Sequence, residues 1–412
     1  MVRESSCSPS FAIATVRSVR PAWIVALVAA LAVALSGCSG EEDTGRARPA
    51  AGRTPIVVEN ATPIGLGRLD PAAAAATAAV QAAQSGGAVP ASTPVPASAK
   101  PDANGPTPTR VSGAPARSGT QIGIVRPSWE SLRLREQELN AQVRQVTGAS
   151  GDEYVRAIDQ LIRGGANVII TVGADMTQAT QDAAERNPNI RFVGVDQYQE
   201  QILSNVVGFA FDDDQAGFLA GALAGMMTKS NFVGAVMGPG WLSPMVGFGE
   251  GFVLGAEYVN PNVIAFVEYH PGELPEGYAD QKWGRDTANQ MVADGADVIF
   301  AAGGATGQAA IDAARTKNVF SIGAEIDQYD ALPNARSVLL TSIIKVISTQ
   351  SIQALVRGIS DGSVKGGNVL GDLAIAAYRE AEPKVPKQVR DRLQTIERGL
   401  KQGSVKTGFQ LH

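Results

Sequence analysis

The loops that follow several predicted strands carry carboxylates, aromatic rings and glycines. They contain Trp129, Asp196, Trp241, Tyr278, Gly303 and Glu325. Rings stack on flat ligands, carboxylates accept hydrogen bonds, and glycine backbones allow close approach of a ligand. Strand-to-helix loops are commonly polar and rich in glycine, so one such loop indicates little. Together they favour a site for a polar ligand with a flat ring, such as a nucleoside or a sugar.

The sequence offers few residues for catalysis or for binding a metal ion. The only histidines are His270 and His412, which excludes a histidine-based triad or zinc cage. The glycine-rich stretch that starts at Gly303 lacks the lysine of a phosphate-binding loop. We therefore expect no catalytic residue, no metal site and no cofactor.

An acidic run, Asp212 to Asp214, precedes a predicted helix from Gln215 to Met227. Carboxylates at this position cap free N–H groups and complement the helix dipole. We expect capping rather than metal binding.

From Thr120 onward, short apolar runs alternate with helical patterns. The expected strands are 121–125, 142–146, 168–172, 191–195, 232–236, 263–269, 298–302, 320–324, 339–343 and 367–373. Further helices are expected over 177–185, 246–258, 287–294, 307–316, 346–359 and 386–402, with one more around Tyr154 to Ile162. Such alternation predicts an α/β fold of parallel sheets covered by helices.

Two successive series of strands and helices predict two lobes. We expect the first lobe to comprise 119–228 plus 329–362, and the second 229–328 plus 363–412. The chain would then cross between the lobes three times, which forms a hinge.

The amino-terminal region predicts a lipid anchor. Arginines 3, 17 and 20 precede an apolar run too short to span a bilayer comfortably, and the run ends at Leu35-Ser36-Gly37-Cys38. Residues 1–38 therefore resemble a lipoprotein signal peptide, and Cys38 would become the lipidated amino terminus. The alternative is an uncleaved signal anchor. Residues 39–118, rich in alanine, proline, glycine, serine and threonine, are expected to form a disordered tether.

The net charge and the cysteine content limit what the protein can bind and whether it can form disulfides. The formal net charge is −5, which argues against nucleic-acid binding. Besides Cys38 the chain contains only Cys7, which lies in the signal segment, so no disulfide is expected.

The chain from Thr120 to Gly408 resembles the basic membrane protein (Bmp) family of substrate-binding lipoproteins, which includes purine nucleoside receptors of ABC transporters. The segments that carry the resemblance are 213–221, 227–229, 249–252, 295–300, 327–328 and 340–345. The resemblance implies a type I periplasmic-binding-protein fold that closes on its ligand.

The resemblance also assigns roles to residues. The family's carboxylate after the fourth strand matches Asp196, and its base-stacking ring matches Tyr278. Its ribose-binding aspartate and lysine match Glu325 and Lys345. The family's first ligand loop is missing, and the stretch that begins at Trp129 resembles the helix after it.

We therefore expect a protein outside the cytoplasm, anchored to the cell membrane by lipidated Cys38. It would capture a small polar ligand, favoured to be a nucleoside, and deliver it to an ABC transporter permease. The alternatives are a ligand sensor for a membrane receptor and a nucleoside-processing enzyme.

Overall fold

The computed structural model describes residues 119–128, 130, 132, 134–148 and 151–409. The predicted signal segment, the tether, Cys38 and Trp129 lie outside the described residues.

The first sheet contains six parallel strands in the order β11-β5-β4-β3-β1-β2. Its strands are β1 (Ile122–Pro127), β2 (Gln142–Val146), β3 (Val168–Val172), β4 (Arg191–Val195), β5 (Val206–Ala210) and β11 (Gly367–Leu370). The inner strands β3 and β5 are buried along their whole length. Burial on both faces requires the nearly continuous apolar runs that these strands have.

The second sheet has the order β12-β10-β9-β8-β6-β7, and only β12 runs antiparallel to its neighbour. Its strands are β6 (Phe232–Pro239), β7 (Ile264–His270), β8 (Val298–Ala301), β9 (Phe320–Glu325), β10 (Leu339–Val346) and β12 (Asp372–Ile375).

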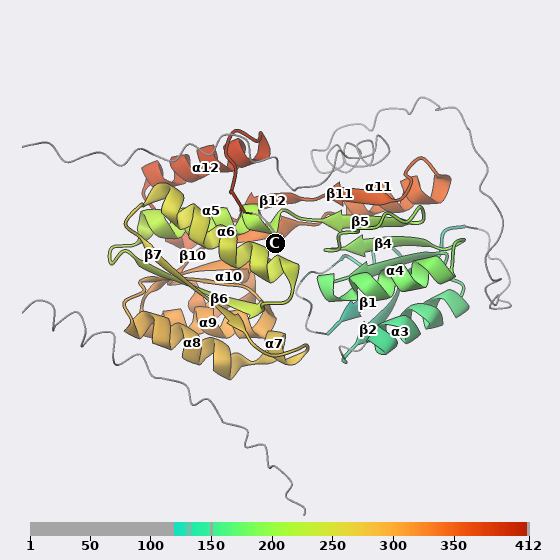
Figure 1. The fold of residues 1–412 in the computed structure, drawn as a ribbon, viewed down its shortest axis with the longest axis horizontal. Helices are drawn as coiled ribbons and strands as arrows, with labels where there is room; N and C mark the ends of the chain where they lie inside the picture. The colour runs from blue at the N-terminus through green and yellow to red at the C-terminus, as the bar shows by residue number, and fades with distance from the viewer. Residues whose placement is uncertain (1–118, 129, 131, 133, 149–150, 410–412) are drawn as a thin grey trace, which may run out of the picture. The chain divides into compact units, whose positions relative to one another are not determined.

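Helices connect and cover the strands (Figure 1). The helices are α3 (Gly151–Arg163), α4 (Thr177–Arg186), α5 (Asp213–Met227), α6 (Ser243–Val259), α7 (Glu276–Ala279), α8 (Gln281–Ala293), α9 (Gly304–Lys317), α10 (Gln328–Ala331), α11 (Thr349–Asp361) and α12 (Lys387–Lys401). In α3, Tyr154, Ile158 and Leu161 face the first sheet because they recur at helical spacing.

The chain passes between the two sheets three times. It leaves the first sheet after β5, returns after β10 and leaves again after β11. The predicted architecture of two parallel-sheet lobes joined by three crossovers is therefore confirmed.

The expected lobe boundaries, 119–228 plus 329–362 and 229–328 plus 363–412, differ from the observed strand pairing. Strand β10, expected in the first lobe, pairs with β9 and β12 in the second sheet. Helix α5 packs on α6 and therefore also belongs to the second lobe, whereas β11 pairs with β5 in the first. The predicted strand 367–373 is two strands, because the chain changes sheet at Gly371.

Glycines bring α5 and α6 into backbone contact. A Cβ atom at Gly221 would lie 1.9 Å from the Phe252 carbonyl oxygen, and one at Gly255 would lie 2.0 Å from the Phe218 carbonyl oxygen. No larger residue fits without separating the helices. This contact fixes the start of α5 to the second lobe.

The segment between β1 and β2 is short and contains no helix in its described residues. The expectation of a helix after Trp129 is therefore wrong for this part of the chain. Leu132, Leu134 and Leu139 pack instead into the apolar core that includes Ile124. Leucines outside regular secondary structure thus cover this face of the first sheet.

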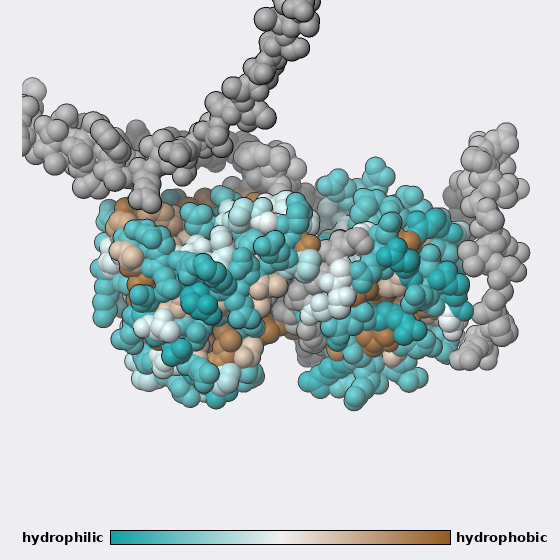
Figure 2. Space-filling view, turned by 90° about the horizontal axis from the view of Figure 1, so that it is seen from below, coloured by the Kyte–Doolittle hydropathy of each residue, from teal (hydrophilic) through white to brown (hydrophobic). Residues whose placement is uncertain are grey.

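The face of the molecule seen in Figure 2 is largely hydrophilic, with hydrophobic residues in small patches. Among the described helices, none combines the length and apolar character needed to cross a membrane.

Candidate functional site

A buried ammonium group lies at the centre of the site. The Lys345 side chain is fully buried on β10, and its Nζ donates to Asp196 Oδ1 at 2.7 Å and Oδ2 at 2.9 Å. The same nitrogen lies 2.9 Å from Asp213 Oδ1. It also lies over the rings of Phe211 and Phe248, 5.4 and 5.2 Å from their centroids. One cation is thus shared by two carboxylates and two aromatic faces.

Charge keeps this lysine protonated. Burial alone would lower the pKa of Lys345, but the carboxylates of Asp196, Asp213 and Glu325 outweigh burial and raise it above its ordinary value. The site therefore presents a cation as long as these carboxylates surround it.

Asp196 and Glu325 lie where parallel strands end, the edge at which such sheets bind ligands. Asp196 directly follows β4 and Glu325 ends β9. Both have left-handed backbones, with φ of 61° and 67°. Such conformations are costly away from glycine and cluster at functional sites. The backbone thus turns both carboxylates out of their strands.

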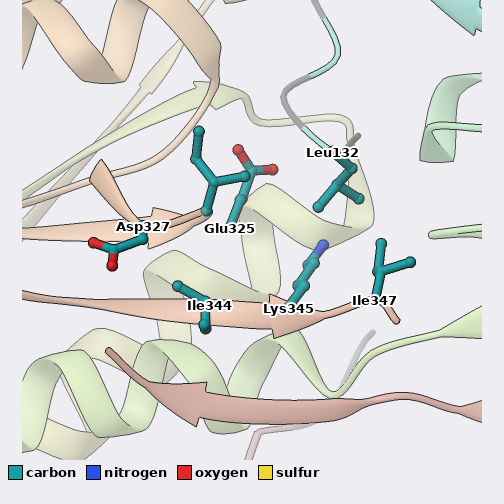
Figure 3. Close-up of a pocket in the computed structure, with 7 residues that line it drawn as sticks. Leu132, Glu325, Asp327, Ile344, Lys345 and Ile347 are labelled. Carbon is teal, nitrogen blue, oxygen red and sulfur yellow. The ribbon is translucent and has the colours of Figure 1, made fainter. Parts of the chain in front are cut away.

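A cavity of about 190 Å³ adjoins the lysine. Its lining residues are Leu132, Glu325, Ile326, Asp327, Ile344, Lys345 and Ile347. In Figure 3 the Lys345 ammonium points toward the space between Glu325 and Leu132. Leu132 comes from the first lobe's segment between β1 and β2, whereas Glu325 and Lys345 come from second-lobe strands. The cavity is thus bounded by both lobes.

Asp327 contributes to the wall rather than to the polar centre. Its carboxylate accepts from the Tyr329 backbone N–H at 3.1 Å and pairs with Arg379 at 2.7 Å. Figure 3 shows it directed away from Lys345. Asp327 therefore caps α10.

Two further carboxylates surround the site. Burial, followed by the charges of Glu325 and Asp196, raises the pKa of Glu130 to about 8. Burial also raises the pKa of Asp175 to about 6, against the opposing hydrogen bond from the Tyr154 hydroxyl. Both groups therefore titrate near neutral pH.

Asp213 titrates in the same range despite its lysine partner. Burial raises its pKa to about 8, Lys345 opposes the shift, and the charge of Asp196 adds to it. The main physical reason is burial of the carboxylate, and the competition of Asp196 for the same cation adds to it.

Tyr278 is buried at the carboxyl end of the second sheet. The residue is 8% exposed, and burial raises the pKa of its hydroxyl well above the ordinary value. Its ring lies against the backbone at Gly238 and Gly304, where an added Cβ would lie 3.1 and 3.0 Å from ring atoms. Gly303 has a φ of 99°, and a Cβ added there would lie 2.5 Å from the Gly238 backbone nitrogen. Only glycine permits this approach of the loop before α9 to the end of β6.

Other predicted site residues lie elsewhere. Trp241, 52% exposed after β6, does not line the cavity. The structure brings Asp196, Lys345 and Glu325 together, with Tyr278 electrostatically coupled to the two carboxylates.

Sequence reasoning missed Asp213, Glu130 and Leu132 as site residues. The expected capping by the acidic run is wrong: at the start of α5, the Asp212 side chain makes no capping hydrogen bond. Asp212 accepts from Gln215, Asp214 from Thr407, and Asp213 faces Lys345. The run itself was visible, but the partners of Asp213 and Asp214 are more than 100 residues away in sequence.

Among the described residues, no group of histidine, cysteine, aspartate and glutamate is arranged to hold a metal ion. Carboxylates that accept hydrogen bonds from hydroxyl groups, together with one ammonium that donates them, suit an organic polar ligand.

Two parallel-sheet lobes, three crossovers and a polar site bounded by both lobes define the type I periplasmic-binding-protein fold. Solved structures agree on the fold. A solute-binding protein of an ABC transporter system from Aeropyrum pernix matches with a TM-score of 0.56 and 18% identity, covering 69% of this chain and 92% of that one. A transcriptional activator of the comK gene from Bacillus halodurans matches with a TM-score of 0.55 and 22% identity, covering 69% and 98%.

Proteins similar in sequence indicate a narrower class of protein within this fold. Basic membrane protein D of Borreliella burgdorferi is 27% identical over 60% of this chain and 71% of its own. The ABC transporter nucleoside-binding protein BmpA of Lactococcus lactis is 26% identical over 59% and 72%.

Residues 123–371 match the Bmp family, described as ABC transporter substrate-binding protein PnrA-like. The chain belongs to this family. The predicted resemblance is confirmed, and the family consists of solute-binding proteins rather than enzymes.

Proposed function

We propose that this protein captures a nucleoside between its lobes and delivers it to an ABC transporter permease. The observation that carries the proposal is the Lys345 ammonium, held between carboxylates beside a cavity that both lobes bound. Membership of a substrate-binding family supports the same function.

The polar groups suit a sugar. Glu325 accepts hydrogen bonds from ribose hydroxyls, and Lys345 donates to ribose oxygens. Asp196 contacts donor groups of the ligand once its pairing with Lys345 is exchanged.

The ring of Tyr278 supplies the stacking surface for a base. The cavity of about 190 Å³ is smaller than typical ligand pockets, which begin near about 300 Å³. Ligand entry therefore requires the lobes to separate from the described arrangement, and this separation exposes Tyr278.

Calorimetry with a panel of nucleosides, free bases and ribose tests the proposal. Tyr278→Ala should weaken binding of nucleosides and bases by about 1–3 kcal/mol, the range for base stacking. Glu325→Gln should weaken the binding of nucleosides by a similar amount and leave the binding of free bases unaffected. Tyr258→Ala and Glu268→Gln are matched controls, because both residues lie on the surface of the second lobe away from the cavity.

Failure of every nucleoside to bind at about millimolar concentration, the weak end of the affinity scale, would refute the nucleoside assignment. Consumption of a nucleoside on incubation would instead show an enzyme.

We further propose that the protein acts outside the cytoplasm and is held at the cell membrane by lipid on Cys38. The motif Leu35-Ser36-Gly37-Cys38 after an apolar run supports this anchor. Mass spectrometry of membrane fractions should find the wild type acylated and Cys38→Ala unmodified.

A further inference from the structure

The acidic residue at the first position of α5 is placed differently from its two neighbours. The Asp213 side chain is 12% exposed and lies 2.9 Å from the Lys345 ammonium. Asp212 accepts from Gln215, and Asp214 accepts from Thr407. Of the three, Asp213 alone reaches the site.

The two carboxylates that hold Lys345 belong to different lobes. Asp196 follows β4 of the first sheet. Asp213 starts α5, which packs on α6 and contacts β10, the strand that carries Lys345. Asp213 and Lys345 thus move as one body, whereas Asp196 belongs to the other lobe.

This division gives the two carboxylates different roles. A ligand that enters between the lobes competes with Asp196 for the ammonium. A buried ammonium that loses every counter-ion gives up its proton, because burial disfavours the charged form. A counter-ion on the lysine's own lobe prevents this loss, and Asp213 ionises more readily once the charge of Asp196, which raises its pKa, has moved away.

We propose that Asp213 is a positioning residue that keeps the Lys345 ammonium charged and in place when a ligand replaces Asp196. Asp213 acts through Lys345 and makes no contact with the ligand itself. Lys345 therefore always acts as a donor, and the position beside it takes an oxygen acceptor of the ligand, such as a sugar hydroxyl. This last step rests on the proposed ligand site.

The first test needs no ligand. Asp196→Asn removes the first-lobe carboxylate and imitates its displacement. The charge of Lys345 is then followed in the full chain by nuclear magnetic resonance of ¹³C-labelled lysine side chains. We expect Lys345 to remain charged at about pH 10.4, the ordinary lysine pKa, in Asp196→Asn. It should become neutral below that pH in Asp196→Asn with Asp213→Asn.

The matched control replaces Asp214 in place of Asp213. Asp196→Asn with Asp214→Asn should keep Lys345 charged, because Asp214 faces Thr407. The charged groups that act on Asp213 are Lys345, Asp196 and Glu325. Since Glu325 is present in every variant, a loss of charge only in the Asp213 variant assigns the effect to that residue. Loss of charge in Asp196→Asn alone, or its retention without Asp213, would overturn the proposal.

A second measurement uses the single variants and adenosine or inosine as the probe. Asp213→Asn should weaken binding about tenfold or more, and Asp214→Asn should change it less than about twofold. In a Lys345→Met background, Asp213→Asn should add no further loss, because its effect passes through the lysine. Equal losses in both backgrounds would show a merely structural role and overturn the proposal.

The two proposals fail separately. A wild type that binds no nucleoside contradicts the proposed function, and the lysine titration still decides the role of Asp213. If the doubly substituted protein does not fold, the affinity of Asp213→Asn relative to Asp214→Asn decides it.

Discussion

Removing the Lys345 ammonium is the most informative perturbation of this fold. In Lys345→Met the side chain keeps its approximate volume, but Asp196 and Asp213 lose their shared cation. Both carboxylates stay buried, because their neighbours are unchanged.

The expected cost follows from this burial. Breaking a buried ion pair by removing one partner costs about 3–5 kcal/mol, since the remaining charge is uncompensated. Asp213, whose pKa is raised to about 8, carries a proton near pH 6 and leaves an uncompensated charge only at higher pH. We therefore expect the lower end of the range near pH 6 and the upper end near pH 9.

Urea denaturation measures this difference. With an m-value of about 3 kcal/mol/M, the loss lowers the midpoint by about 1–2 M. Lys387→Met is the matched control, because Lys387 is exposed and pairs with Asp391 one helical turn away. Such a pair contributes only about 0.5 kcal/mol.

A compensating variant sharpens the test. Lys345→Met combined with Asp196→Asn and Asp213→Asn removes both stranded charges and should recover most of the lost stability. A Lys345→Met midpoint within about 0.3 M of the wild type, or no recovery in the combined variant, would refute the buried-charge reasoning.

Three further predictions concern other parts of the chain. Gly221→Ala should destabilise the fold by about 1–3 kcal/mol in urea, because its Cβ would lie 1.9 Å from an α6 carbonyl oxygen, whereas Gly151→Ala, with open space around it, should be neutral or slightly stabilising. The free energy of unfolding should fall as pH rises from about 4 to about 8. The reason is that Glu130 and Asp213, with pKa values raised to about 8, bind protons in the folded state that the unfolded chain releases. Asp213→Asn should flatten this pH dependence of the urea midpoint, and an unchanged slope would contradict the prediction. Limited proteolysis should trim the chain to a fragment that starts near residue 120 and binds ligand as the full chain does, and a resistant fragment that retains 39–118 would contradict the tether.

Much of the architecture is visible in the sequence because it depends on local patterns. Strands such as Val168–Val172 and Arg191–Val195 match their predicted bounds, since apolar runs between helical stretches are distinctive. The strand Val206–Ala210 was missed, because five apolar residues next to a long helix carry no periodicity of their own.

The assignment of strands to lobes is not a local property. Residues 339–346 form a recognisable strand, but nothing in them states which sheet they join. The pairing of β10 with β9 arises from the path of the whole chain, so the lobe boundaries depend on tertiary structure.

The same distinction applies to the site. Asp196, Glu325 and Lys345 were identified by position in the fold or by resemblance, and the structure brings them together. Asp213 was interpreted as a local cap because the acidic run fits a helix start. Its actual partner is 132 positions further along the chain, a contact that only tertiary structure creates.

The three passages between the sheets are very short. Two residues separate β5 from α5, two separate β10 from α11, and Gly371 alone separates β11 from β12. One residue spans at most about 3.6 Å, so the lobes pivot about a few backbone dihedrals and cannot slide apart. Lys345 and Asp213 each lie within two residues of a passage, close to the pivot, where a rotation produces small displacements. The far rims have a long lever arm, so spectroscopic labels on α3 and α8 should register opening of the lobes more strongly than any label beside the lysine.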